Sequence, residues 1–162
     1  MKFNCGLYIS KVQPLHIAHI KVINNMLNNC GTVVIAIEND PKSIYPWAIE
    51  DRIEMIERIF DSVIIKVIPI PALSITDKWR TQFLKITDIC KNYLYPYDPD
   101  VIYTVTKEQT QCYTNFAHVE ELLQDITDAF IQKEIKNNRA IDHLVPSQIL
   151  PIIYRSLDMK KL

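Results

Sequence analysis

Glycine is scarce in this chain of 162 residues, since only Gly6 and Gly31 occur. These two lie too far apart in sequence for the phosphate-binding loop G-x-x-x-x-G-K-[ST], and they are too few for the three-glycine fingerprint G-x-G-x-x-G of dinucleotide-binding folds. P-loop ATPases and dinucleotide dehydrogenases of the usual kind are therefore excluded. If the chain binds phosphate groups, another segment must do so.

Long apolar runs and an excess of basic residues are also missing. No apolar run approaches the ~20 residues that a membrane-spanning helix needs, and residues 1–6 lack the features of a signal peptide. A formal net charge of -1 offers no basic field for a nucleic acid. The four cysteines include no C-x-x-C pair, so we expect free thiols. These absences predict a cytoplasmic protein with neither a membrane nor a nucleic-acid partner.

The order of apolar segments predicts the fold class. We expect strands over Phe3–Ser10, Thr32–Ile37, Val63–Ile70, Val101–Val105 and Phe116–Val119, and helices over Ile17–Asn29, Ala48–Phe60, Asp77–Tyr93 and a last segment ending near Leu157. Gly31 is expected to cap the first helix in a left-handed conformation. Alternating strands and helices with short connections predict an α/β fold, a Rossmann-like doubly wound parallel sheet. The length, the composition and the lack of repeats or linkers predict a single domain over residues 1–162.

The segment richest in chemistry follows the first expected strand and reads Gln13-Pro14-Leu15-His16-Ile17-Ala18-His19. Two histidines three residues apart at a helix start can face one point, where backbone N–H groups gather and negative charge is favoured. In sheets of this class ligands bind beyond the carboxyl ends of the strands. The turn therefore predicts a site for nucleotide phosphates. The alternative is a helix cap and a packing residue. A zinc site is disfavoured, because the other histidines, His118 and His143, lie far away in sequence.

This turn resembles the H-x-G-H signature of the nucleotidyltransferase superfamily, and the chain is most similar to nicotinamide-mononucleotide adenylyltransferases of the archaeal type. Three later segments resemble that family in the expected order. Tyr45–Ile56 is similar to N-P-F-[ST]-x-x-E-R-x-x-M-[IL], Asp77-Lys78-Trp79 to a polar pair before tryptophan, and Leu144–Ile149 to L-[VL]-P-x-x-[VI]. The resemblance covers nearly the whole chain and implies an adenylyl- or cytidylyltransferase-like fold.

The resemblance also implies a reaction. ATP and a pyridine mononucleotide would form a dinucleotide, as in NAD synthesis, with release of pyrophosphate. The residues that it implies are Lys11, His16 and His19 at the ATP phosphates, Gln13, Ala18, Thr127 and Gln132 in nucleotide binding, and Trp47, Asp77 and Trp79 at the acceptor. Mg²⁺ would bridge the leaving phosphates, and no metal held by the protein's own side chains is implied. The partners are small-molecule nucleotides, and because the family is often multimeric, a homo-oligomer is implied.

Several positions depart from the family pattern. Ala18 stands where the family has glycine, and Lys11 replaces an arginine, which loses a bidentate fork. The best match to the second motif, I-S-x-T-x-[IV]-R, is Ile126–Gln132. Gln132 there lacks the arginine's charge, and Asp128 adds negative charge where phosphates are expected. Loss of one preorganised contact of this kind can cost ~100- to 1,000-fold in rate. The alternative function is a non-catalytic nucleotide-binding or regulatory relative, which would bind nucleotide without turnover.

Overall fold

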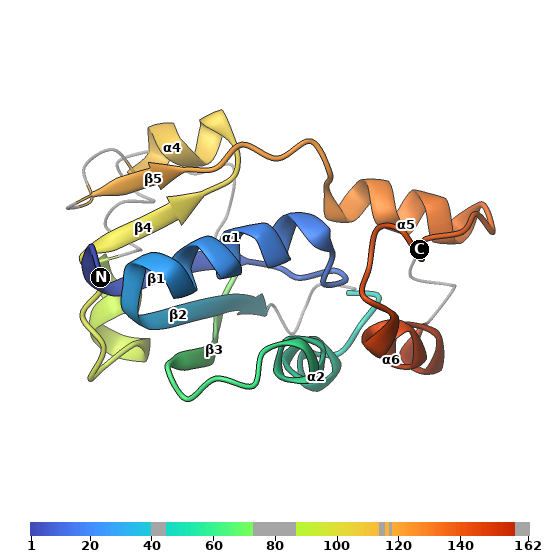
Figure 1. The fold of residues 1–162 in the computed structure, drawn as a ribbon, viewed down its shortest axis with the longest axis horizontal. Coiled ribbons are helices and arrows are strands. Elements are labelled where there is room, and N and C mark those ends of the chain that lie inside the picture. Colours follow the sequence, from blue (N-terminus) through green and yellow to red (C-terminus); the bar gives the residue numbers. More distant parts are fainter. Residues whose placement is uncertain (40–44, 73–86, 114–115, 117, 158–162) are drawn as a thin grey trace.

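A single parallel sheet organises the computed structural model, which describes residues 1–39, 45–72, 87–113, 116 and 118–157. The strands are β1 (Phe3–Ser10), β2 (Cys30–Asn39), β3 (Ile65–Pro71), β4 (Val101–Thr104) and β5 (Val119–Glu121). They are arranged in the order β3-β2-β1-β4-β5, and every neighbouring pair is parallel (Figure 1). The prediction of a Rossmann-like doubly wound sheet is confirmed.

Helices cover both faces of this sheet. The helices are α1 (Ile17–Asn29), α2 (Ile49–Ile59), α4 (Lys107–Tyr113), α5 (Asp128–Lys136) and α6 (Leu150–Ser156), with a short 3-10 turn, η1 (Ser147–Ile149), before α6. Alternate residues of β1 enter different cores, since Tyr8 packs with side chains of α1, α2, α5 and α6, whereas Leu7 and Ile9 pack with Tyr113 of α4. Burial on both faces explains why the strands are near-continuous apolar runs.

The first helix lies close against β1 because of Gly6. A Cβ atom built on Gly6 would lie 2.6 Å from the Sγ of Cys30 and 3.2 Å from the Cε of Met26. Gly31 does not form the helix cap that the sequence predicts. It lies within β2, and no described glycine has a positive φ, so the prediction of a left-handed cap is wrong. The chain passes directly from α1 into β2, because the pairing of Cys30 with Phe3 extends that strand.

The strand order reverses at β1, which lies between β2 and β4. In open parallel sheets this reversal leaves a crevice at the carboxyl ends of the two central strands. The connection after β1 leads into α1, and α5 lies beyond the same ends of the strands (Figure 1). The fold thus brings the starts of two helices to one crevice.

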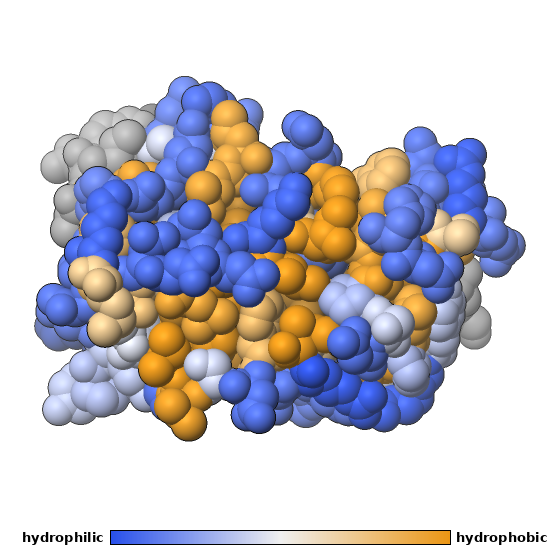
Figure 2. All heavy atoms as spheres, viewed as in Figure 1, coloured by the Kyte–Doolittle hydropathy of each residue, from blue (hydrophilic) through white to orange (hydrophobic). Residues whose placement is uncertain are grey.

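The surface on the face that carries α1 is mixed in character. Figure 2 shows an apolar band bordered by hydrophilic residues on this face. Ile20, Leu27 and Ile53 are among the partly buried side chains that pack against the core beneath α1 and α2. In the described part of the chain, no helix combines the length and apolar character needed to span a membrane.

Candidate active site

The turn between β1 and α1 ends in two histidines whose rings cap the helix. His16 is the N-cap of α1, and its Nδ1 accepts a hydrogen bond from the backbone N–H of Ala18 at 3.3 Å. The Nδ1 of His19 accepts a hydrogen bond from the backbone N–H of His16 at 3.2 Å. Both residues are buried, with 2% and 5% of their surfaces exposed. The two histidines therefore form a capping box, in the places that Ser or Thr and Glu usually hold.

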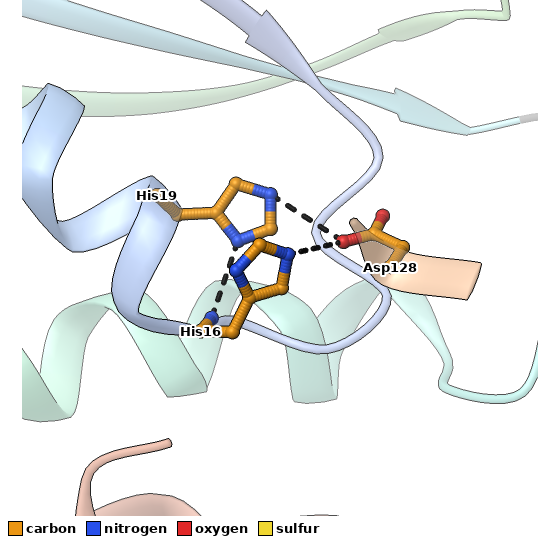
Figure 3. Close-up of side chains that lie close together, drawn as sticks. All are labelled: His16, His19 and Asp128. Carbon is orange, nitrogen blue, oxygen red and sulfur yellow. Dashed lines mark hydrogen bonds and ion pairs between the residues drawn. The ribbon is translucent and has the colours of Figure 1, made fainter. Parts of the chain in front are cut away.

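These bonds determine which ring nitrogen of each histidine carries the proton. A nitrogen that accepts a hydrogen bond uses its lone pair, so a neutral ring must carry its hydrogen on Nε2. The Nε2 of His16 lies 3.1 Å from the Oδ1 of Asp128. The Nε2 of His19 lies 3.5 Å from the same oxygen and 3.1 Å from the Oγ of Ser10. Figure 3 shows both rings directed at this carboxylate. His16 donates its hydrogen bond to Asp128, whereas His19 donates to Ser10 and lies beside the same carboxylate.

Asp128 reaches the histidines from the start of α5. Thr127 caps this helix, because its hydroxyl oxygen accepts a hydrogen bond from the backbone N–H of Phe130 at 3.2 Å. A carboxylate in the first turn of a helix is favoured by the helix dipole. The second oxygen of Asp128, Oδ2, accepts a hydrogen bond from the backbone N–H of Gln13 at 3.0 Å. One carboxylate thus links the start of α5 to the turn after β1.

The protonation states of this cluster complement one another. Burial lowers the pKa of His19 to about 3, since desolvation outweighs the opposing attraction of Asp128, and His16 adds to the lowering. Burial alone would raise the pKa of the Asp128 carboxyl. The hydrogen bond from His16 and the proximity of both rings reverse this effect, so that pKa lies below its usual value. At neutral pH a neutral His19 ring therefore faces an ionised carboxylate.

A pocket of about 590 Å³ lies beside the cluster, at the carboxyl end of the sheet. Its volume is within the range of sites that hold small-molecule ligands. The expected site residues that line it are Lys11, His16, Ala18, His19 and Thr127. Residues after β4 and the helix α4 form the opposite wall, among them Thr106, Gln109 and Tyr113. The pocket therefore occupies the crevice where the strand order reverses.

The charges of the lining side chains are unbalanced. Lys11 is exposed and is the lining residue with a full positive charge, whereas Glu38, Glu108 and Asp128 carry carboxylates. A triphosphate without a bound cation would therefore meet more negative than positive charge among the described residues that line the pocket. Divalent cations that accompany nucleotides prefer oxygen ligands such as these.

A buried arginine holds the backbone next to Lys11. Arg52 on α2 is 0% exposed, and its guanidinium donates hydrogen bonds to the carbonyl oxygens of Lys11 at 2.8 Å and Glu38 at 2.9 Å. It also donates to the Oδ1 of Asn39 at 2.8 Å. Between Lys11 and the histidines, Val12 has a φ of 54°, a left-handed conformation that costs free energy for a β-branched residue. The turn is therefore held in an unfavourable backbone conformation by its surroundings.

Three of the expected ligand residues lie behind this turn and do not line the pocket. The side-chain amide of Gln132 donates to the carbonyl oxygen of Gln13 at 2.8 Å. The Oε1 of Gln13 in turn accepts from the backbone N–H of Trp47 at 3.4 Å. Trp47 is 0% exposed in the core, and its indole N–H donates to the carbonyl oxygen of Ile153 at 3.2 Å. In this position Trp47 supports the turn as a core residue, and the expected contact with an acceptor is not supported.

The remaining expected acceptor residues, Asp77 and Trp79, lie outside the described residues. The structure adds Ser10 and Glu38 to the pocket lining, which sequence reasoning missed. Ser10 ends β1, and Glu38 lies near the end of β2. Polar residues at the carboxyl ends of neighbouring parallel strands were the available signal for both.

The donor atoms of His16, His19 and Asp128 all lie within 4.8 Å of one another, as in a site for a metal ion. The sequence argument against a metal considered only distant histidines and did not include Asp128. A histidine that binds a metal through Nε2 normally donates its other ring N–H to an acceptor. Here both Nδ1 atoms are acceptors from backbone N–H groups, so the Nε2 atoms hold hydrogens and offer no lone pair. The arrangement is better suited to an anion than to a metal ion.

Several solved proteins share this fold. A bifunctional NMN adenylyltransferase/ADP ribose pyrophosphatase from Francisella tularensis has a TM-score of 0.65 and 17% identity, over 90% of this chain and 45% of that one. NadR protein in complex with NR has a TM-score of 0.67 and 14% identity, over 92% and 45%. NadR protein in complex with NAD and AMP-PNP has a TM-score of 0.56 and 17% identity, over 83% and 42%. The chain spans about half the length of these proteins, and identities this low show the shared fold alone.

Sequence comparisons place the chain more specifically. No curated protein matches it in sequence. Residues 7–156 match the cytidylyltransferase-like family, a match that includes β4, β5 and α6 as well as the histidine turn and α5. Family membership supports nucleotidyl transfer as the general chemistry of the pocket. By this match over most of its length, the chain belongs to the cytidylyltransferase-like family.

Proposed function

We propose that this protein transfers the adenylyl group of ATP to a pyridine mononucleotide and releases pyrophosphate. The observation that carries the proposal is the pair of imidazole N–H donors at the start of α1, which face the same pocket as Lys11. The location of this pocket at the reversal of strand order agrees with nucleotide binding. The similarity to an NMN adenylyltransferase and to NadR supports a pyridine mononucleotide as acceptor.

Adenylyl transfer requires that the two substrates be positioned and that the developing negative charge be stabilised. A phosphate oxygen of the acceptor forms a bond to the α-phosphorus of ATP, and the bond from that phosphorus to the bridging oxygen of the β-phosphate breaks. The electron pair leaves with pyrophosphate, so negative charge grows on the leaving oxygens. Lys11, His16 and His19 stabilise this charge as preorganised donors. Imidazole N–H groups suit this part, because they donate hydrogen bonds without undergoing proton transfer.

Two further features complete the proposed site. Asp77 and Trp79 hold the acceptor, as the resemblance implies, and Mg²⁺ accompanies the ATP phosphates and offsets their charge. The pocket residue Glu38 offers carboxylate oxygens, which are ligands of the kind that Mg²⁺ prefers. The structure of the Francisella protein with AMP and a manganese ion agrees with the use of a nucleotide and a divalent cation. We also propose a cytoplasmic single-domain protein that forms a homo-oligomer.

Release of pyrophosphate tests this function directly. Purified protein is incubated with ATP, Mg²⁺ and a panel of mononucleotides that includes the nicotinamide and nicotinate forms, and pyrophosphate is measured in a coupled assay. We expect turnover with a pyridine mononucleotide, and a fall in kcat/KM of about 100- to 1,000-fold in H16A and in H19A. H143A is the matched control, because His143 is exposed and does not line the pocket. An absence of pyrophosphate with every mononucleotide would rule the proposal out.

The second candidate is a relative that binds nucleotides without turnover. It is favoured by Gln132, whose side-chain amide donates a hydrogen bond to the carbonyl oxygen of Gln13. This side chain does not line the pocket and carries no positive charge. Calorimetry that shows ATP binding in the absence of pyrophosphate release would select this candidate. If Q132R then gained transferase activity, the missing charge would be the reason for the lack of turnover.

A further inference from the structure

We propose that Asp128 occupies the phosphate-binding position of the active site and that a nucleotide phosphate must displace its carboxylate to bind. The inference rests on the proposed function, because it takes the ligand of this position to be a phosphate group of a nucleotide. It makes Asp128 a specificity-determining residue that weakens binding of free polyphosphate. The contacts, exposure and charge of the cluster support it.

The first argument is that the donors around Asp128 form an anion site. Two N–H groups donate hydrogen bonds to its carboxylate, the Nε2–H of His16 to Oδ1 and the backbone N–H of Gln13 to Oδ2. The Nε2 of His19, which lies 3.1 Å from the Oγ of Ser10, is also only 3.5 Å from Oδ1. They are joined by the start of α5, where the helix dipole attracts negative charge. Such a set suits a phosphate equally well, because phosphate oxygens accept the same hydrogen bonds.

The second argument is that these donors cannot serve two anions together. Each ring has one N–H left to donate, on Nε2, since its Nδ1 accepts a backbone hydrogen bond. The hydrogen bond from His16 to a phosphate can form only when its hydrogen bond to Asp128 is lost. A phosphate beside an ionised Asp128 would also be repelled by it.

The third argument concerns the route by which a ligand reaches the rings. The side chains of His16 and His19 are 2% and 6% exposed, whereas that of Asp128 is 22% exposed. All three residues line the pocket, and the Asp128 side chain is the most exposed of them. A ligand that enters the pocket meets Asp128 before it can use the donors. The cap of α5 uses Thr127 and does not depend on the Asp128 side chain.

The test measures binding of inorganic tripolyphosphate by calorimetry in EDTA, so that no divalent cation bridges the anions. D128N removes the charge and keeps the size of the side chain, and D128A removes both. We expect each to bind tripolyphosphate at least tenfold more tightly than the unchanged chain. The matched control is E108Q, which removes a charge from the same pocket at a residue outside the histidine cluster. We expect E108Q to change the affinity less than threefold, and D128N to lose most of its gain in the H16A background.

Two results would overturn the proposal. One is tripolyphosphate binding by folded D128N and D128A that is no tighter than by E108Q. The other needs no variant: on the unchanged chain, saturating tripolyphosphate should shift the Nε2 resonances of His16 and His19 in ¹⁵N spectra, and binding without such shifts would contradict displacement. Pyrophosphate release by the unchanged chain together with either result would leave the proposed function standing. Tighter binding by D128N without turnover by any variant would remove the proposed function and leave this inference.

Discussion

Replacement of Arg52 by methionine should destabilise the protein strongly. The guanidinium is fully buried and donates three hydrogen bonds, to Lys11, Glu38 and Asn39. R52M would leave these acceptors without their donor at the ends of β1 and β2. Loss of one partner of a buried charged network typically costs about 3–5 kcal/mol, which is a large share of the ~5–15 kcal/mol that holds a typical domain folded. Burial also lowers the pKa of Arg52, which shows that its charge is held at a desolvation cost. We therefore expect a loss of about 3 kcal/mol, at the lower end of this range.

The assay is urea unfolding, with the midpoint and slope fitted for each variant. The control is R58M on the same helix, because the ion pair of Arg58 with Glu54 is exposed to solvent and such pairs contribute little to stability. R52K should be intermediate, since lysine keeps the charge but has no planar fork to reach three acceptors. A loss below ~1 kcal/mol in R52M, or a loss equal to that in R58M, would refute the view that Arg52 fixes the ends of β1 and β2.

Three further predictions concern acid stability, packing and metal binding. Because the pKa of His19 is lowered to about 3 in the folded chain, the unfolded chain binds a proton between about pH 6.5 and 3 that the folded chain does not. The free energy of unfolding should therefore decrease as the pH decreases over this range, by at most ~1.4 kcal/mol per pH unit. H19N should flatten this slope in urea unfolding measured from pH 7 to 4, and an unchanged slope would contradict the assignment. G6A should cost about 1–3 kcal/mol, because its methyl group meets the Sγ of Cys30, and C30A should recover part of the loss in thermal unfolding of the double variant; full additivity of the two changes would argue against this contact. Zn²⁺ at equimolar concentration should leave the melting temperature within about 1 °C, because the Nε2 atoms of His16 and His19 carry hydrogens; stoichiometric zinc binding that H16A abolishes would show the opposite tautomers.

The sequence predicted the framework well where local pattern and tertiary contacts agree. β1 and α1 have the predicted bounds, because the apolar run and the capping turn are local signals. The predictions fail where pairing between strands decides. β2 begins at Cys30 because it pairs with Phe3, and β5 lies at Val119–Glu121 because Val119 pairs with Ile102. Neither pairing is encoded in the residues of the strand itself.

The site was predictable only on one side. The spacing of His16 and His19 indicates a helix start with two converging rings, and the structure has this arrangement. Their engagement by Asp128 joins residues 112 positions apart, so it depends on the docking of α5 and not on any local signal. For the same reason Gln132 was expected in the pocket but bonds to Gln13 behind the turn. Motif resemblance identifies the residues at a site, whereas the partner of each side chain is decided by packing.

The many anchors of the histidine turn have a consequence for how the pocket adapts to ligands. Side chains of Arg52 on α2 and Gln132 on α5 hold its backbone, and neither bond involves Asp128. A turn whose backbone is held by side chains of two helices has little freedom to change its conformation when a ligand binds. Differences in ligand size would therefore be accommodated across the pocket, on the wall of Thr106, Gln109 and Tyr113. Within the residues that the structure describes, the side-chain hydrogen bonds of Thr106 and Gln109 are local, within residues 105–109, and do not tie this wall to another helix. Selection for a new acceptor would be expected to act on that side, with the anion-binding side retained.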